Sequence, residues 1–175
     1  MTKTRDYEAQ HPYLRLRTPP PTPPDEICSC SDAPPIKLMT ALGENPIHCM
    51  RCNLEVSPED LPLPLNLVDP VADWARVHRA LELLWLDSGP YEVWATKERT
   101  DPSSPANQRG LLLRSQLDPV RRCYYWLGDI RLTDTTHCPI CAKKLTTFEG
   151  AKDFLEQLVC HSCSLVFGVS AEGAA

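Results

Sequence analysis

Residues 138–163 read CPICAKKLTTFEGAKDFLEQLVCHSC and contain two cysteine pairs of the same internal spacing. Cys138 and Cys141 form the first C-x2-C pair, eighteen residues follow, and Cys160 and Cys163 form the second. This gap lies within the range of about 15–20 residues that is typical of four-cysteine zinc sites. Each pair places two sulfurs in one turn, and two facing turns complete a tetrahedron around one ion. The spacing therefore predicts a structural Zn²⁺ held in a zinc ribbon.

A second group of cysteines repeats this spacing upstream. Cys28-x-Cys30 is followed by eighteen residues and then by Cys49-x2-Cys52. The equal gap predicts a second zinc site, although C-x-C is a less common ligand turn than C-x2-C. Three alternatives stay open: Cys49 and Cys52 bind metal with His48, they remain free thiols, or they exchange partners with a downstream pair.

The nine cysteines occur in a chain that gives no sign of secretion. Residues 1–10 are polar with no apolar region behind them, and no stretch approaches the roughly 18 apolar residues of a membrane span. We therefore expect a cytoplasmic protein that does not bind membranes, with reduced thiols available for metal. Cys123 falls outside both groups, in a strand pattern, and is expected to be a small buried residue.

Thiol redox chemistry is the main competing interpretation. Cys138-Pro139-Ile140-Cys141 alone is similar to the C-x2-C of thiol–disulfide oxidoreductases. That motif normally opens a helix in a βαβ unit, however, and here a matching pair follows at ribbon spacing. The sequence contains no metalloprotease or deaminase signature, no glycine-rich phosphate loop and no nucleophile elbow. Four sulfurs also leave no open metal position, so we expect neither an enzyme nor a small-molecule substrate.

Proline dominates the start of the chain, with seven prolines among the seventeen residues 19–35. Such a stretch forms neither helix nor central strand, so residues 1–26 are expected to be a flexible proline-rich tail. Pro20 and Pro23 alternatively fit a P-x-x-P docking motif. Residues 27–170 are then expected to form the folded domain. It comprises an upstream cysteine turn (28–52), a helix-and-strand middle (69–128) and the zinc ribbon (138–168).

The middle of the chain shows both helical and strand patterns. Asp69 is expected to cap a helix with Pro70 in its first turn, and Gly89-Pro90 ends it. Its His78 is expected to be an ordinary buried or surface residue. Residues 91–95 alternate and predict a strand, and Ser104-Pro105 open a second helix that Pro119 ends.

Three further strands complete the expected fold. Residues 123–127 form a buried strand, and residues 154–159 and 165–169 flank the last cysteine pair. The fold class expected is α+β, with small antiparallel strands, two helices, a C-terminal zinc ribbon and a proline-rich N-terminal tail.

The order of these elements resembles an uncharacterised prokaryotic family described as zinc-ribbon-containing and as a candidate for nucleic-acid binding. The resemblance covers residues 46–168. It rests on the cysteine pairs from Cys49 onward, the Leu/Pro-rich step at 61–65, the aspartate-led helix with Trp74, and the run 124–127. It implies a zinc ribbon and a nucleic-acid-binding role.

This chain departs from that family at the residue after each C-x2-C pair, where glycine is frequent. Asn53, Ala142 and Ser164 occupy these positions. Asparagine adopts a left-handed backbone readily, whereas alanine and serine do so less readily.

Charge bears on the choice of partner. The formal net charge is −5, and each tetrathiolate zinc site makes it more negative, which disfavours a protein that grips phosphate backbones. We therefore expect a non-enzymatic, zinc-stabilised scaffold for protein–protein interaction, with another protein as its partner. The aromatic residues that supply its core or interface are Trp74, Trp85, Trp94, Tyr124, Tyr125 and Trp126.

The alternative function is zinc-ribbon nucleic-acid binding with a regulatory role. Arg121, Arg122 and Arg131 flank the aromatic strand 124–126, and cations beside stacking surfaces suit single-stranded nucleic acid. The opposing interpretation is that these arginines are a solvated strand end.

Overall fold

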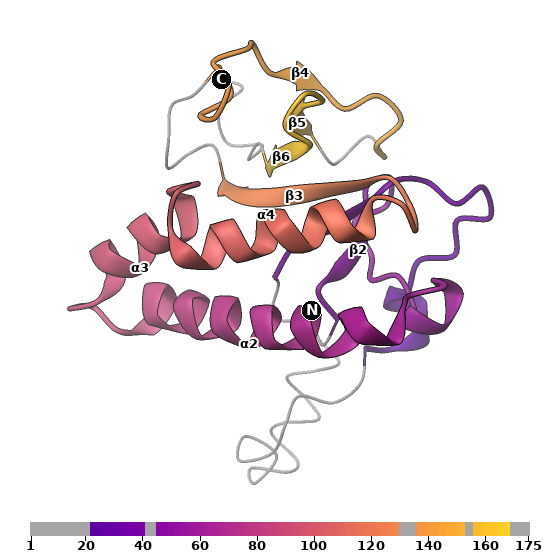
Figure 1. The fold of residues 1–175 in the computed structure, drawn as a ribbon, viewed down its shortest axis with the longest axis horizontal. Helices are drawn as coiled ribbons and strands as arrows, with labels where there is room; N and C mark the ends of the chain where they lie inside the picture. The colour runs from indigo at the N-terminus through magenta and orange to yellow at the C-terminus, as the bar shows by residue number, and fades with distance from the viewer. Residues whose placement is uncertain (1–21, 41–44, 130–135, 153–155, 169–175) are drawn as a thin grey trace, which may run out of the picture.

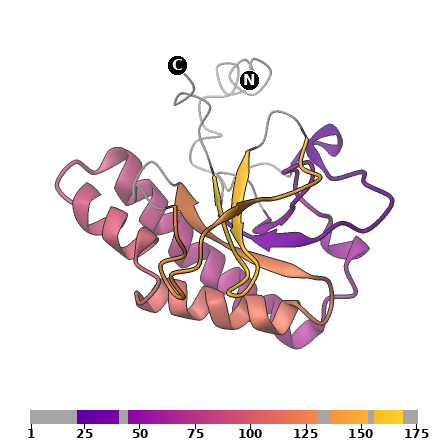
Figure 2. The ribbon, with the colours of Figure 1, turned by 90° about the horizontal axis from the view of Figure 1, so that it is seen from above.

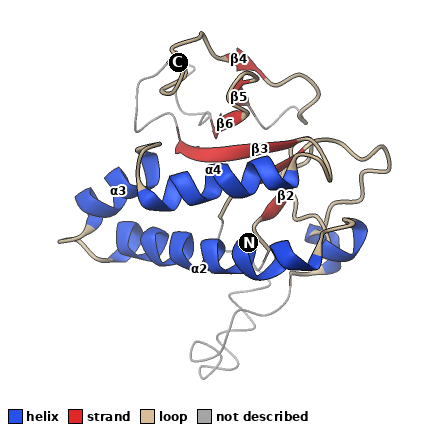
Figure 3. Ribbon diagram, in the orientation of Figure 1, coloured by secondary structure: helices blue, strands red, loops and turns tan. Residues whose placement is uncertain are grey.

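A computed structural model describes residues 22–40, 45–129, 136–152 and 156–168, in which one sheet is covered by helices (Figures 1 and 3). The short elements are η2 (Pro24–Glu26), β1 (Ile36–Leu38), β2 (Ile47–Cys49) and η3 (Pro58–Asp60). The helices are α2 (Leu65–Asp87), α3 (Glu92–Thr100) and α4 (Pro105–Leu117). The remaining strands are β3 (Cys123–Asp129), β4 (Thr146–Thr147), β5 (Gln157–Cys160) and β6 (Leu165–Gly168).

The sheet is mixed and combines strands from the early and late parts of the described chain. Its six strands run in the order β2-β1-β3-β6-β5-β4. The central strand β3 pairs in parallel with β1 on one side and with β6 on the other, whereas the outer pairs are antiparallel. Seen from above in Figure 2, the strands lie in front of the helices. The sheet therefore places the upstream and downstream cysteine turns in one continuous structure.

The two faces of β3 belong to two cores, as expected from the period of two residues in a strand. Cys123, Tyr125 and Leu127 face the main core on the helical side. Tyr124 belongs to a smaller cluster with Met50, Val159 and Val166, against which Trp126 and Phe148 pack. The main core also includes Ile36, Leu38, Leu67, Val71, Trp74, Leu113, Leu117, Leu165 and Phe167.

The expected start of the first helix is wrong. The helix α2 begins at Leu65, one turn before Asp69, and Pro70 lies inside it. Leu67 is buried one turn before Val71, so the apolar stripe begins earlier than the proline suggested. Pro70 is the sixth residue of α2, so its missing N–H removes one intrahelical hydrogen bond, which the burial of Leu67, Val71 and Trp74 on the same helix offsets.

The strand expected at residues 91–95 is also wrong, because α3 occupies this segment. Ala95 is fully buried, whereas Val93 and Trp94 face solvent, which is a helical pattern of exposure. The carbonyls at the end of α3 are capped from α4. Asn107 Nδ2 donates to the carbonyls of Glu98, Arg99 and Asp101 at 2.7–3.1 Å. Capping from the neighbouring helix α4 thus favours a helix in a segment whose local pattern fits both helix and strand.

The second expected helix is confirmed as α4. Ser104 caps it by accepting a hydrogen bond from the backbone N–H of Asn107, and Pro105 occupies its first turn. Gly110 lets α4 approach the aromatic core closely. A Cβ atom at this position would lie 2.2 Å from the Tyr125 ring and 2.7 Å from Trp74 Nε1.

The α+β class is confirmed, but two of its details are wrong. The strands form one mixed sheet instead of small antiparallel units, because β1, β3 and β6 run parallel. The described residues contain three α-helices instead of two. Residues 1–21 of the predicted tail, residues 154 and 155 of one strand and Val169 of another lie outside the described residues. None of the described helices has the length and apolar content needed to cross a membrane.

Replacing Gly110 by Ala is expected to destabilise the protein. The added methyl gains up to about 1 kcal/mol of helix propensity, but it collides with two buried rings and overpacking costs about 1–3 kcal/mol. A lower melting temperature for Gly110→Ala, with an unchanged value for the exposed Gln116→Ala on the same helix, checks this. Equal or higher stability of Gly110→Ala would contradict the close packing.

Mild acid is expected to destabilise the protein through His78. This side chain is buried, its Nε2 lies 3.1 Å from Tyr125 Oη, and burial lowers its pKa to about 4. In the unfolded chain histidine takes up its proton near pH 6.5, so acidification favours unfolding between these two pH values. From pH 7 to pH 5.5 His78 should remove about 1 kcal/mol of unfolding free energy.

Denaturant unfolding at both pH values checks this, with the zinc-loaded protein compared with its His78→Gln variant. The variant should lose less stability than the original chain over the same interval. Equal pH dependence of the two proteins would show that His78 does not titrate as its burial requires.

Candidate metal centres

The C-terminal centre consists of the four cysteines expected from their spacing. The Sγ atoms of Cys138, Cys141, Cys160 and Cys163 all lie within 4.8 Å of one another. Cys141 Sγ and Cys160 Sγ are 3.5 Å apart. In a tetrahedral zinc site with bonds of about 2.3 Å, sulfurs are separated by about 3.8 Å. The group can therefore hold one tetrahedrally coordinated ion.

The N-terminal centre brings together the four cysteines of the predicted second site. The Sγ atoms of Cys28, Cys30, Cys49 and Cys52 also lie within 4.8 Å of one another. His48 is outside the group, with its Nδ1 3.0 Å from the carbonyl of Asn53. In each centre the two pairs that the sequence spacing grouped together lie side by side. The alternative in which Cys49 and Cys52 join a downstream pair is wrong.

The C-x2-C turn at Cys49 and the C-x2-C turn at Cys138 have the same backbone hydrogen bonds. Cys49 N donates to Leu54 O at 2.9 Å, and Cys138 N donates to Lys143 O at 2.8 Å. The residue four positions after the first cysteine donates back to it: Asn53 N to the carbonyl of Cys49, and Ala142 N to the carbonyl of Cys138. The third turn has the same register, with Cys160 opposite Leu165 in the β5–β6 hairpin.

Left-handed backbone occurs where the expected glycines are replaced. Asn53, Ala142 and Ser164 have φ values of 63°, 55° and 51°, and Ala33, just after the C-x-C pair, has 47°. These four are the non-glycine residues with positive φ in the described part of the chain. A left-handed residue costs about 1–2 kcal/mol. Each cysteine turn thus carries a strain that the converging sulfurs must offset.

A side-chain contact joins the two turns of each centre. In the N-terminal centre Arg51 forms an ion pair with Asp32 at 2.6 Å, and this contact lowers the pKa of Asp32. In the C-terminal centre Lys143 Nζ donates to Ser162 Oγ at 2.9 Å. These contacts position the facing turns beside the sulfurs.

Backbone N–H groups prepare selected thiols for ionisation. The N–H of Lys143 lowers the pKa of Cys141 to about 7. Burial opposes ionisation of Cys49, but N–H groups of Cys52 and Arg51 outweigh it and lower its pKa. Burial raises the pKa of Cys28 and Cys163. A dication would supply the missing charge stabilisation, because metal ligation keeps a thiol deprotonated.

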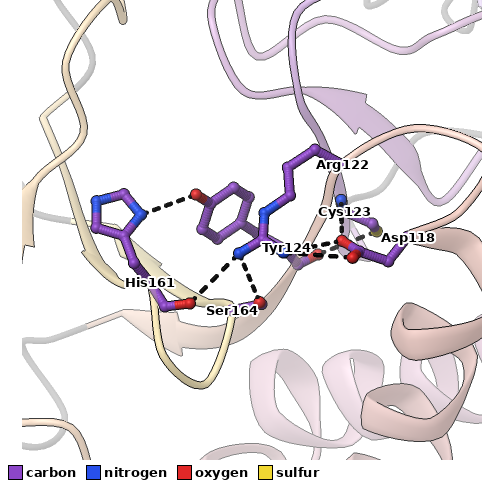
Figure 4. Close-up of polar contacts among 6 residues, drawn as sticks. All are labelled: Asp118, Arg122, Cys123, Tyr124, His161 and Ser164. Carbon is purple, nitrogen blue, oxygen red and sulfur yellow. Dashed lines mark hydrogen bonds and ion pairs between the residues drawn. The ribbon is translucent and has the colours of Figure 1, made fainter.

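Arg122 anchors the C-terminal centre to the helical layer (Figure 4). Its Nη2 donates to the carbonyl of His161 at 3.3 Å and to Ser164 Oγ at 3.0 Å, and its Nη1 pairs with Asp118. Tyr124 Oη lies 2.9 Å from His161 Nδ1 beneath the same guanidinium. Arg122 is therefore engaged within the protein.

The aromatic strand offers little surface for stacking nucleotides. Tyr124 is 4% exposed and Tyr125 is fully buried. Arg121 donates to the carbonyl of Asp60, and Arg131 lies outside the described residues.

The two centres are linked through Met50, which lies between the ligands Cys49 and Cys52. Its side chain is buried against Val159 on β5, and its carbonyl accepts a hydrogen bond from Gln157 Nε2 at 2.8 Å. Gln157 Oε1 in turn accepts from Lys37 Nζ at 2.7 Å. Lys152 N also donates to Arg51 O at 3.0 Å.

Lys37 is an unexpected component of this link. Its side chain is 1% exposed, and Nζ lies 4.9 Å from the centre of the Trp126 ring. Burial lowers the pKa of Lys37 to about 7, while the negative sulfurs of Cys49 and Cys52 act in the opposite direction. A single lysine between Ile36 and Leu38 gives no sequence signal of burial, so it could not have been found before the strands were paired.

The surroundings of Cys138 and Cys141 differ from those of a redox motif. The pair lies in a hairpin turn that leads towards β4, and no helix of the described residues begins there. All nine cysteines are free thiols, and Cys123 is fully buried as expected.

No family model, no curated protein and no solved structure matches this chain. The functional interpretation therefore rests on the two cysteine groups and on the residues around them.

Replacing Ala142 by Gly is expected to stabilise the protein by about 1 kcal/mol, because glycine adopts positive φ without strain. The exposed methyl of Ala142 contributes no burial that would be lost. Thermal melting of the zinc-loaded variant checks this. The comparison variant Ala151→Gly, at a half-buried position whose own φ is not positive, should instead lose stability. A destabilised Ala142→Gly would show that the turn is not strained.

Proposed function

We propose that this chain is a non-enzymatic scaffold protein in which two structural zinc ions shape a surface for another protein. The observation that carries the proposal is the convergence of two groups of four sulfurs, each within 4.8 Å. Tetrahedral sites of four thiolates suit zinc or iron–sulfur centres. Zinc is favoured here because the spacing and the repeated hairpin turns are those of a zinc ribbon in the C-terminal centre.

A structural role fits the chemistry of these ligand sets. A catalytic zinc keeps one position open for water or substrate, whereas four thiolates fill the tetrahedron. Zinc in small domains contributes on the order of 10 kcal/mol of apparent binding free energy at neutral pH. That exceeds the net stability of most domains, so the ions would hold the cysteine turns in place.

Exposed apolar side chains support a protein partner. Leu65 at the start of α2 is 88% exposed, and Val93 on α3 is 83% exposed. Tyr91 and Trp94 are about half exposed at the junction of α2 and α3. Leu65 lies at the opposite end of α2 from the other three, so the group consists of Tyr91, Val93 and Trp94. Apolar residues gathered on a surface in this way are typical of protein–protein contacts. Nucleic-acid binding is less well supported, since Arg122 and Tyr124 are engaged within the fold.

Metal analysis of the purified chain tests the proposal. We expect two zinc ions per chain, falling to one in the Cys28→Ser/Cys30→Ser variant and to one in Cys138→Ser/Cys141→Ser. Cys123→Ser is the matched control, because Cys123 is buried outside both groups and should leave the count at two. A strong chelator should also lower the melting temperature.

Two results would contradict the proposal. If the purified chain contained iron and acid-labile sulfide instead of zinc, the centres would be iron–sulfur clusters and the zinc assignment would be wrong. A chain that binds no metal and keeps its melting temperature in the presence of a chelator would remove the structural role of the cysteines.

A further inference from the structure

A cavity of about 470 Å³ lies beside the N-terminal metal centre, and the zinc chemistry does not use it. One wall is the segment that follows Cys52, where the carbonyl of Glu55 accepts a hydrogen bond from Cys28 N at 2.7 Å. The opposite wall is the first half of α2. The ligand turns therefore fix one side of the cavity and a core helix fixes the other.

The interior of the cavity is mainly apolar. Ile27 comes from the N-terminal segment, Leu63 precedes α2, and Val68 and Val71 come from the helix itself. Binding pockets for small groups have volumes of about 300–1,000 Å³ and combine apolar walls with a few polar groups. This cavity has both properties.

The charged groups of the cavity are acidic, and Thr22, Asn45 and Ser57 are its neutral polar residues. Glu55 is 7% exposed, and its Oε2 accepts a hydrogen bond from Thr22 Oγ1 at 2.7 Å. The described residues offer its Oε1 no donor. Glu59 contributes a second carboxylate at the exposed side, and no Lys, Arg or His is among the described lining residues. A buried carboxylate with one hydroxyl partner is only partly satisfied and is stabilised by a cation.

These observations determine the chemistry of the occupant. An anion would meet two carboxylates and a chain of net charge −5. A wholly apolar group would leave Glu55 without a counter-charge. A lysine or arginine side chain satisfies both parts of the cavity, because its aliphatic stem contacts apolar walls while its charged end pairs with the carboxylate.

We propose that this cavity binds a lysine or arginine side chain presented by a basic, partly apolar segment of the partner protein. The inference rests on the proposed scaffold function and identifies the part of the surface that recognises the partner. Glu55 is the recognition residue, and the N-terminal metal centre holds it in place through the segment that follows Cys52.

Short peptides test the proposal on the zinc-loaded, full-length chain. The probes are acetylated pentapeptides Gly-Leu-X-Leu-Gly in which X is lysine, norleucine or glutamate, titrated while the methyl NMR signals of Ile27 and Val71 are followed. The lysine peptide should give saturable shifts. Norleucine, which keeps the stem without the charge, should bind about tenfold more weakly, and glutamate should not bind.

Variants separate the cavity from the rest of the surface. Glu55→Gln retains a partner for Thr22 but removes the charge, so the preference for lysine over norleucine should disappear. Val68→Lys places an ammonium group at the cavity wall and should abolish binding. Leu83→Lys is the matched control, since Leu83 is a similarly exposed residue of α2, 49% against 43%, outside the cavity.

Three results would overturn the proposal: equal binding of the lysine and norleucine peptides, an unchanged preference in Glu55→Gln, or no shift with the lysine peptide. Zinc is measured in the same samples. Two ions per chain with no peptide binding would refute the cavity proposal alone, whereas a folded chain without zinc would refute the proposed function and the inference that rests on it.

Discussion

The convergence of four sulfurs on one point is the constraint on which the rest of the structure depends. Each cysteine turn must bring its thiols inward, and in the three C-x2-C turns the residue after the pair has a left-handed backbone. The turns then set the register of the strands that leave them, as in the hairpin that places Cys160 opposite Leu165. Short strands of two to seven residues gain little from their own ladders. The cysteine turns and the helical layer therefore define where they lie.

The two centres are parts of one structure and not independent modules. Met50 projects from the turn of the N-terminal centre into the core beneath β5, and Gln157 bonds to its carbonyl three residues before Cys160. Lys37, whose pKa burial lowers to about 7, places a buried amino group near sulfurs that carry negative charge when ionised. The two centres are thus joined by packed side chains and by two hydrogen bonds to the backbone of Met50 and Arg51.

The sequence predicted the parts of the protein that depend on local spacing. The cysteine groups, α4 with its Ser104 cap and the strand from Cys123 follow from short-range patterns, and the structure contains them. The errors come from contacts with other elements. The segment at Tyr91 alternates like a strand, but Asn107, in the first turn of the next helix α4, caps it as a helix. The parallel pairing of β1, β3 and β6 and the burial of Lys37 depend on contacts between residues far apart in the chain.

The position of β6 has a consequence for the order of assembly. This strand consists of residues 165–168, yet it lies inside the sheet between β3 and β5. During translation β3 can pair with β6 only after residue 168 has left the ribosome. Until then the backbone edge of β3 that pairs with β6 is uncovered. Nascent chains with such late, non-local pairing fold slowly and are prone to association.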